Sequence, residues 1–520
     1  MSPTTVPVSS AVPGLRRNMV TICAMTATIM QALDTTIANV ALPYMQGSLS
    51  ASQDQINWVL TSYICAAAIM TAPVGWIANR FGRKRIFIIC SAGFTIASVM
   101  CGVAQDINQM VLFRLLQGVF GAALVPLSQA VMLDSYALHE RAKAMAIWGM
   151  GVMMGPIMGP SLGAWLTETY SWHWVFFVNI PFGIVTVAGL MIFMDETRKN
   201  LDLRFDWFGF LALSIGIGSL QLALDRGEQL GWLGSNEIII EFIVAAIGVY
   251  YFFAHSFTTP KPFIQFAIFK DRNFVSGCVF MAVMGLVLYS TMALSSPYLQ
   301  NVIGYPIITA GLLLATRGSG TFVAMMLVGR MMKYIEARTL IIAGLGLTGF
   351  SLFYMTGWTD QTGVPEIVTV SIVQGFGFGL VFVPLSTVAF LTLPNHLRTD
   401  GTSMLTLMRN VASSIGISVV IAQLTEGGRR DYAILSEHIN PFNHAMQMPN
   451  VRGMIDMSSD GGRALADVMV AIQAQIIAFS QDYQLVMFFI LGSIPLAIMI
   501  GSTKAALRSQ QAAAEHAVID

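Results

Sequence analysis

Fourteen stretches of about 20 mostly apolar residues follow one another along the chain, and this pattern constrains the fold more than any other feature. In a bilayer core such a stretch is expected to be helical, because a helix satisfies its own backbone hydrogen bonds. With 55% hydrophobic and 11% charged residues, the 520-residue chain is not a soluble globular protein. We therefore predict an all-α integral membrane protein with spans at residues 19–43, 56–77, 86–104, 109–133, 144–166, 173–194, 207–225, 237–256, 274–299, 309–329, 339–358, 366–391, 402–424 and 482–503.

Charge and cysteine content exclude several classes of function. Lys+Arg and Asp+Glu both number 28, so the formal net charge is zero and no global basic field favours nucleic-acid binding. The five cysteines lie inside apolar stretches without CxxC spacing, as expected of small hydrophobic residues. The sequence has no GxxxxGKS, GxxxxGKT, HExxH or GxSxG pattern. We therefore expect no cofactor, no metal and no enzymatic activity, and a process driven by the proton gradient.

Lysine and arginine residues in the short loops predict the orientation, since they concentrate on the cytoplasmic side. With the N-terminus inside, the inside segments hold 20 of these residues and the outside loops hold 5, four of them in one long loop at 425–480. The remaining three, Arg114, Arg317 and Arg409, lie within spans. Both termini are expected in the cytoplasm, with tails at 1–18 and 504–520.

The fourth and twelfth spans share a pattern that indicates an internal duplication. A Gln-Gly-Val-Phe-Gly run at 117–121 precedes Val-Pro-Leu-Ser at 125–128, and a Gln-Gly-Phe-Gly run at 374–377 precedes Val-Pro-Leu-Ser at 383–386. The prolines are 258 residues apart, more than the roughly 200 residues of six spans and their loops, which fits two inserted helices. The predicted parts are a six-helix bundle at 19–195, two inserted helices with linkers at 196–273 and a second six-helix bundle at 274–503. A chance likeness of two Gly- and Pro-bearing helices is the alternative.

Asp34 is the only carboxylate in the middle of the first span. A carboxyl in a low-dielectric bundle binds a proton more readily than one in water, and a nearby cation or water reverses this when a cavity opens. Asp34 is therefore a candidate proton carrier, with a purely structural contact to Thr35 or Asn39 as the alternative. Arg114 in the fourth span costs roughly 2.5 to 3.5 kcal/mol near the bilayer centre, so it should face a cavity, a carbonyl or a carboxylate. A purely structural tie between helices is the alternative to a functional role for Arg114.

The fifth span has small residues along one face. Glycines recur every four residues and are interrupted by two prolines, the set being Gly151, Gly155, Pro156, Gly159, Pro160 and Gly163. This spacing lets helices approach closely, and proline permits a bend. Helix packing alone is the alternative.

A tight loop, Gly-Trp-Ile-Ala-Asn-Arg-Phe-Gly-Arg-Lys-Arg at 75–85, follows the second span. Its glycines allow the turn, and its cations can neutralise helix C-termini and face anionic lipid. The candidate gate residues are Gly75, Asn79, Arg80, Gly82 and Arg83. A purely topogenic role for the charges is the alternative.

These motifs, with the segments at 172–181 and 218–227, resemble the major facilitator superfamily, its fourteen-span drug:proton antiporter family 2 and, within that family, the EmrB-type multidrug efflux pumps. The resemblance covers residues 15–503. It implies two six-helix bundles, a loop at 75–85 that latches neighbouring helices, an antiporter motif in the fifth span and a part for Arg114 in proton coupling. It also implies a periplasmic adaptor and an outer-membrane channel as partners. The sequence departs from the superfamily at Asn79, where an acidic residue is common.

We therefore expect a multi-pass protein of the bacterial inner membrane that exchanges protons for hydrophobic or amphipathic drugs by alternating access. The cavity should be lined by aromatic, Met and polar side chains rather than a charged clamp; candidate lining residues are Asn39, Gln117, Arg409 and Asn410. The loop at 425–480 has apolar residues at helical spacing over 464–479, which predicts an amphipathic helix there, and the loop is expected to dock the adaptor or cover the outer exit. A flexible tether is the alternative. Alternatives are export of one physiological compound, such as a siderophore, lipid or metabolite, and a non-transporting scaffold or sensor.

Overall fold

The computed structural model describes residues 14–499 except 138–139, 198, 201–203, 260–261, 395–396, 441–442, 445–447, 449–456 and 458. The regular elements in this part of the chain are helices: α1 Gly14–Ser48, α2 Gln53–Thr71, α3 Val74–Phe81, α4 Arg83–Gly102, α5 Ile107–Gly121, α6 Leu124–Ser135, α7 Arg141–Thr169, α8 Trp174–Phe177, α9 Asn179–Phe193, α10 Trp207–Leu230, α11 Asn236–Thr258, α12 Arg272–Pro297, α13 Ile307–Met331, α14 Ala337–Met355, α15 Val364–Val388, α16 Arg398–Glu437 and α19 Asp460–Ser493. The predicted tail at 504–520 and residues 1–13 of the N-terminal tail lie outside the described residues.

The helices confirm the all-α fold and the expected spans. Thirteen helices of the described chain are long and apolar enough to cross a membrane, and the bent pair α2 and α3 brings the number to fourteen. The two helices of this pair meet at 56°. Pro73 caps α3 at the bend, where its missing N–H interrupts the helical hydrogen-bond ladder.

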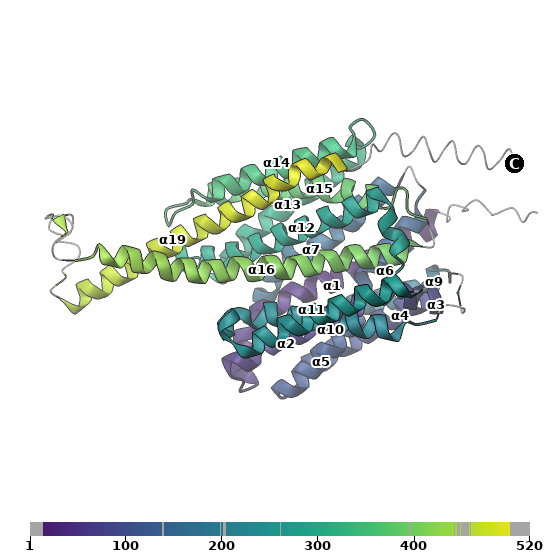
Figure 1. The fold of residues 1–520 in the computed structure, drawn as a ribbon, viewed down its shortest axis with the longest axis horizontal. Helices are drawn as coiled ribbons and strands as arrows, with labels where there is room; N and C mark the ends of the chain where they lie inside the picture. Colours follow the sequence, from purple (N-terminus) through teal and green to yellow (C-terminus); the bar gives the residue numbers. More distant parts are fainter. Residues whose placement is uncertain are drawn as a thin grey trace, which may run out of the picture.

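Two helical bundles lie side by side in Figure 1, with α1 to α9 in the first and α12 to α19 in the second. Within the first bundle, α1 packs on α7 and α9, and α5 on α2 and α4. Within the second, α15 packs on α13 and α14, and α16 on α12 and α19. The bundles meet where α7 contacts α13 and where α6 contacts α16. The interior between them is therefore formed mainly by α7, α12, α13 and α16.

The two helices that follow the first bundle in the sequence pack on each other, and α10 also packs on both bundles. α10 contacts α11, α2 of the first bundle and α16 of the second. Thr61 of α2 donates a hydrogen bond to Asp225, and the Ser418 hydroxyl of α16 donates one to the Leu224 carbonyl at 2.7 Å. The segment at 218–227 therefore joins the inserted helices to both bundles.

The segment expected as a long loop at 425–480 differs in the structure. α16 continues to Glu437 and α19 already begins at Asp460, so the 464–479 segment is helical and continuous with the last span. The two helices pack on each other and project beyond the other helices in Figure 1. At 1.5 Å per residue the 40 residues of α16 reach about 60 Å, roughly twice the bilayer core. We call the described parts of 425–437 and 460–480 the hairpin.

Candidate functional site

A buried ion pair joins the first and fourth spans. The Arg114 guanidinium Nη1 donates to the Asp34 carboxylate Oδ2 at 2.7 Å, and both residues are almost fully buried. Arg114 also donates through Nε to the Val59 carbonyl of α2 at 3.0 Å and through Nη1 to Gln117 Oε1 at 2.9 Å. The guanidinium thus has a carboxylate, an amide and a carbonyl as partners, as a charge buried in a bundle requires.

Two side-chain amides complete the hydrogen bonds of Asp34. The Gln117 side-chain amide donates to Oδ1 at 2.7 Å, and the Asn179 amide donates to the same oxygen at 3.1 Å. Asn179 is also bonded to the Ser98 hydroxyl at 3.0 Å. The Tyr63 ring lies under the guanidinium, 4.4 Å from ring centroid to Cζ, within the range of a cation–π contact. Five helices of the first bundle therefore converge on one ion pair.

The glycine face of the fifth span packs directly on the helix that carries Asp34. A Cβ at Gly155 would lie 2.1 Å from the Ala32 carbonyl oxygen, and one at Gly159 would lie 2.0 Å from Thr36 Oγ1. Thr36 donates to the Gly155 carbonyl at 3.0 Å across this contact. Gly151 and Gly163 face Met25 and Ile37 of the same helix. Thus α7 touches α1 immediately before and after Asp34 in the sequence.

The segment at 75–85, expected as a tight loop, is mostly helical: it comprises most of α3, a break at Gly82 and the start of α4. It lies against the start of α16, so it joins the two bundles. Asn79 donates to Asp400 Oδ1 at 3.4 Å, and a Cβ at Gly75 would overlap this carboxylate at 2.0 Å. Gly82 adopts a φ of +96°, which glycine tolerates best, and sits against Glu196. The Arg80 guanidinium lies over the Trp76 ring at 5.5 Å. The carboxylate that the loop lacks at Asn79 is thus supplied by the opposite bundle.

A second contact at this end has a carboxylate shared between the bundles. Asp134 at the end of α6 pairs with Arg83 of α4 through Oδ2. Its other oxygen accepts a hydrogen bond from Arg398 Nη1 of α16 at 2.7 Å. We call Asp134, Arg83, Arg398, Asn79 and Asp400 the latch. α16 begins at the latch and ends in the hairpin, so these features lie at opposite ends of the molecule.

Two adjoining cavities lie between the bundles. The first is a small cavity between α7, α12 and α13, and its lining residues are Met153, Ile157, Pro160, Leu288, Met292, Leu314, Arg317, Gly318 and Thr321. The second is smaller and shares Met153 and Leu288 with the first; it adds Met284, Tyr289, Phe378, Phe382 and Arg409. The walls are mostly apolar, as in sites for small molecules.

The sequence identified Asp34, Arg114 and Gln117, and the structure brings these three together. It places Arg409 at a cavity wall beside Asn410, whereas Asn39 is exposed and outside the cluster around Asp34. Pro160 lines the first cavity.

Sequence reasoning did not single out Asn179, Tyr63, Asp134, Arg398 and Asp400. The signals were weak: a single polar residue in an apolar stretch for Asn179, and charges at span ends for the latch. Their roles depend on which helices meet, and one sequence does not give that information.

The arrangement defines a membrane transporter, because two bundles enclose a cavity with buried charges beside it. A family model described as Major Facilitator Superfamily matches residues 24–417. The multidrug export protein EmrB of Escherichia coli K12 is 34% identical over 444 residues, covering 85% of this chain and 86% of the relative. The fatty acid resistance protein FarB of Neisseria gonorrhoeae is 33% identical, with 82% and 84% covered.

Among solved structures, the human organic anion transporter MFSD10 has a TM-score of 0.57 at 13% identity, over 91% of this chain and 99% of that chain. A bacterial homologue of the human lysosomal transporter Spinster, in an inward-facing conformation, has a TM-score of 0.53 at 18% identity, with 94% and 98% covered. The chain belongs to the major facilitator superfamily and, within it, to the EmrB-type family. It is a multi-pass transporter of the bacterial inner membrane.

Proposed function

We propose that the chain exports hydrophobic or amphipathic drugs in exchange for protons, by alternating access of the cavities between its bundles. The bundles correspond to residues 19–195 and 274–503, with 196–273 as the inserted part. The proton gradient is the energy source, and no cofactor takes part. Relatives named multidrug export proteins favour drugs over one physiological compound as substrate.

The buried pair of Asp34 and Arg114 is the observation that carries the proposal. Asp34 accepts bonds from three side chains, so in this conformation both of its carboxylate oxygens have partners. Protonation of Asp34 would cancel its attraction for Arg114, and reformation of the pair would release the proton. Movement of the surrounding helices would control when Asp34 takes up and releases its proton. Proton passage is thereby coupled to a change in the side of the membrane to which the cavity opens.

The latch and the glycine face supply the moving parts of the proposal. We place the latch, with both termini, on the cytoplasmic side, so this structure is closed toward the cytoplasm. Opening there requires Asp134 to release Arg398 and Asn79 to release Asp400. The contact of Gly155 and Gly159 with α1 would transmit the movement of α7 to the helix of Asp34 and limit proton leak.

Inverted membrane vesicles provide the test of proton coupling. A proton gradient is imposed, a panel of lipophilic drugs is added, and gradient dissipation is followed for the wild type and Asp34→Asn. Asparagine keeps the size of the side chain and loses the exchangeable proton, so substrate-dependent dissipation should disappear. Asp360→Asn, which changes an exposed carboxylate in a loop, is the matched control and should behave as wild type. Unchanged dissipation in Asp34→Asn would place the proton site elsewhere.

The hairpin is the proposed docking element for a periplasmic adaptor, which would connect the pump to an outer-membrane channel. It projects from the end opposite the latch, and its helices are stabilised by contacts between Arg430 and Gln481 at 2.9 Å and between Tyr432 and Asp467. This side is periplasmic in the proposed orientation. The described hairpin is long enough to offer a partner a rigid helical surface outside the bilayer.

A shortened hairpin tests the docking proposal. A Cβ at Gly427 would lie 3.6 Å from Ala478 Cβ, so residues 433 and 472, six residues beyond this contact on each of the antiparallel helices, lie at about the same level and can be joined by a short turn. Residues 434–471 are replaced by a short Gly-Ser turn. Drug resistance in cells and crosslinking to the adaptor should both fall, while gradient dissipation in vesicles is retained. Unchanged resistance and crosslinking would reject the docking role.

A further inference from the structure

The last long helix carries a buried carboxyl group at the base of the hairpin. Asp482 of α19 is fully buried, and neither of its carboxylate oxygens has a hydrogen-bond partner among the described residues. A Cβ at Gly427 of α16 would lie 3.6 Å from Ala478 Cβ, and residues four apart share a face of a helix. Asp482 therefore lies on the side of α19 that packs on α16, with Phe479 and Val486 buried about one turn away.

A second carboxylate at this junction shows what Asp482 lacks. Asp431 of α16 is 7% exposed, and it accepts hydrogen bonds from Gln481 Nε2 at 3.1 Å and from Arg430 Nε at 3.3 Å. Asp482 has no such donor in the described structure, although it directly follows Gln481 in the chain. An ionised carboxylate is costly in such a place, because nothing replaces the water that it loses on burial. Asp482 is therefore accommodated in this arrangement as the neutral acid.

The charged groups around Asp482 do not compensate it. α19 packs on α12, α14 and α16. The charged residues of these helices and of the 359–366 segment nearest the base of the hairpin are exposed or already paired: Asp360, Glu366, Glu426, Arg429, Arg430 and Asp431. The charged residues of α12 and α14 stand at the starts of these helices, Arg272 and Arg338. Ser480 marks the opposite end, because its hydroxyl donates to the Thr356 carbonyl directly after α14 at 2.7 Å.

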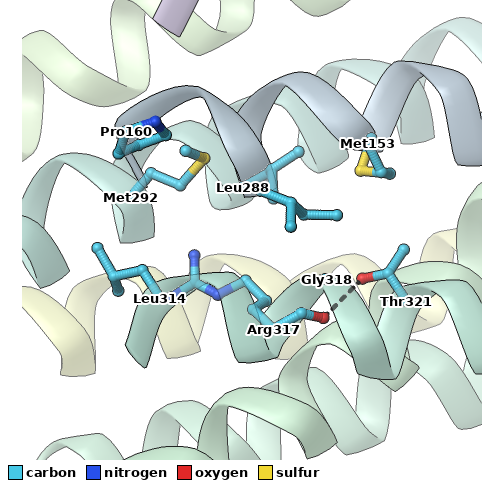
Figure 2. Close-up of a pocket in the computed structure, with 9 residues that line it drawn as sticks. Met153, Pro160, Leu288, Met292, Leu314, Arg317, Gly318 and Thr321 are labelled. Carbon is cyan, nitrogen blue, oxygen red and sulfur yellow. Dashed lines mark hydrogen bonds between the residues drawn. The ribbon is translucent and has the colours of Figure 1, made fainter. Parts of the chain in front are cut away.

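The nearby phenol groups have other partners. The Tyr483 hydroxyl lies 3.4 Å from the Ser295 hydroxyl, which accepts a hydrogen bond from Arg317 Nη2 at 3.3 Å. Arg317 lines the first cavity together with Met292 (Figure 2). The Tyr298 hydroxyl donates to a backbone carbonyl at 2.9 Å. One turn of α19 thus directs a phenol toward the cavity wall and a carboxyl group toward α16.

We propose that Asp482 is a proton-binding site at the hairpin end of the second bundle, and that its proton holds α19 against α16. When the two helices separate, water solvates the carboxylate, the O–H bond breaks and the proton passes to that water. When they pack again, the carboxylate takes a proton back from water. Acid on this side, which is periplasmic in the proposed orientation, therefore favours the packed junction, and alkali favours separation. The site does not depend on the proposed export function; it adds control by outer pH to the surface that the hairpin offers a partner.

Infrared spectroscopy of the full-length protein in nanodiscs tests the protonation. The carbonyl band of protonated carboxyl groups is recorded over a pH series from mildly acidic to alkaline, in the wild type and in Asp482→Asn. The wild type should have one additional acid band that persists at neutral pH, where exposed carboxyl groups are ionised, and disappears on further addition of alkali. Asp431→Asn and Asp360→Asn, which change a hydrogen-bonded and an exposed carboxylate at the same end of the molecule, are the controls and should keep this band. Identical spectra of the wild type and Asp482→Asn, or loss of the band in Asp431→Asn, would overturn the inference.

A distance measurement tests the link between protonation and helix packing. Spin labels are attached to cysteines introduced at two exposed positions, Glu426 of α16 and Gln475 of α19, in a protein whose five native cysteines are replaced. With Asp482 present, the label distance should be short at acidic pH and gain a longer component at alkaline pH. Asp482→Asn keeps a neutral side chain at every pH, so it should hold the short distance throughout, whereas Asp360→Asn should behave as the wild type does.

A second neutral variant, Asp482→Leu, guards against a folding defect that is specific to asparagine, and thermal unfolding shows that each variant is folded. Asp482→Leu should also hold the short distance at every pH. A distance that does not depend on pH with Asp482 present, or a pH response that persists in the folded neutral variants, would overturn the inference. Both measurements are made without a drug or a proton gradient, so their outcome is separate from that of the vesicle assay for Asp34→Asn.

Discussion

The two bundles differ in the polar partners of their buried charged residues at corresponding positions of the internal repeat. In the first bundle Gly118 lets the fourth span approach the Tyr63 carbonyl, and the adjacent Gln117 bonds to Asp34. In the second bundle Gly375 lets the twelfth span approach the Arg317 carbonyl, while the Oε1 atom of the adjacent Gln374 has no hydrogen-bond partner. The backbone packing is preserved and the polar network is not. The first bundle thus neutralises its buried arginine with a carboxylate, whereas Arg317 of the second bundle has only hydroxyl partners among the described residues.

Removing the carboxylate from the first bundle should have the largest effect on stability. Asp34→Ala leaves Arg114 buried without its counter-charge, which should cost about 3–5 kcal/mol of unfolding free energy. Replacing both residues, as in Asp34→Ala with Arg114→Met, should recover most of this loss, because no unpaired charge is left. Denaturant unfolding in detergent measures both. Equal stability of the single and double variants would show that the pair is not the source of the effect.

The close contact between α7 and α1 should be the next most sensitive feature. Gly155→Ala places a methyl group against the Ala32 backbone, which cannot move aside easily, so it should cost about 1–3 kcal/mol and slow transport. Gly151→Ala on the same face meets only the flexible end of Met25 at 3.1 Å and should cost clearly less. Thermal unfolding and vesicle transport of the two variants give the comparison. A larger loss for Gly151→Ala would contradict the assigned contact.

The sequence alone predicts most of the membrane spans and about half of the residues around Asp34 and in the latch. Helical spans follow from local hydropathy, and Asp34 and Arg114 stand out because charges in apolar stretches are rare. The partners of Asp400 and the second partner of Asp134 lie more than 250 residues away in the chain, so no local pattern identifies them. The hairpin is not predicted as a continuation of two spans because charged, glycine and glutamine residues interrupt its apolar ones, and such mixed segments between spans resemble loops.

A buried carboxylate in the second bundle offers the opposite test to Asp34. Asp482 of α19 is fully buried, and neither carboxylate oxygen has a hydrogen-bond partner within the described structure. Asp482→Leu should therefore raise the unfolding free energy by about 1–2 kcal/mol, since it removes an unsatisfied group. Asp360→Leu at an exposed loop position should change it by less than about 0.5 kcal/mol. Destabilisation by Asp482→Leu would indicate that this carboxylate has a partner in another access state.

The latch should show the smallest effect on stability, because the Asp134 side chain is one-third exposed. A double-mutant cycle with Asp134→Asn and Arg398→Gln should give a coupling energy of about 1 kcal/mol. The same variants should increase labelling of cysteines introduced on the cavity wall by a thiol reagent added from the cytoplasmic side. A coupling energy of zero together with unchanged labelling would show that the contact between Asp134 and Arg398 is not part of the gate.

The length of α16 has a mechanical consequence. One uninterrupted helix begins at the latch, passes the cavity at Arg409 and ends in the hairpin. Over its length of about 60 Å, a tilt of about 10° around the latch displaces the far end by about 10 Å. The helix is in effect a lever: in the proposed orientation, a small rotation at the latch becomes a large displacement of the hairpin outside the bilayer. A partner bound to the hairpin would sense the access state of the pump without contacting the cavity.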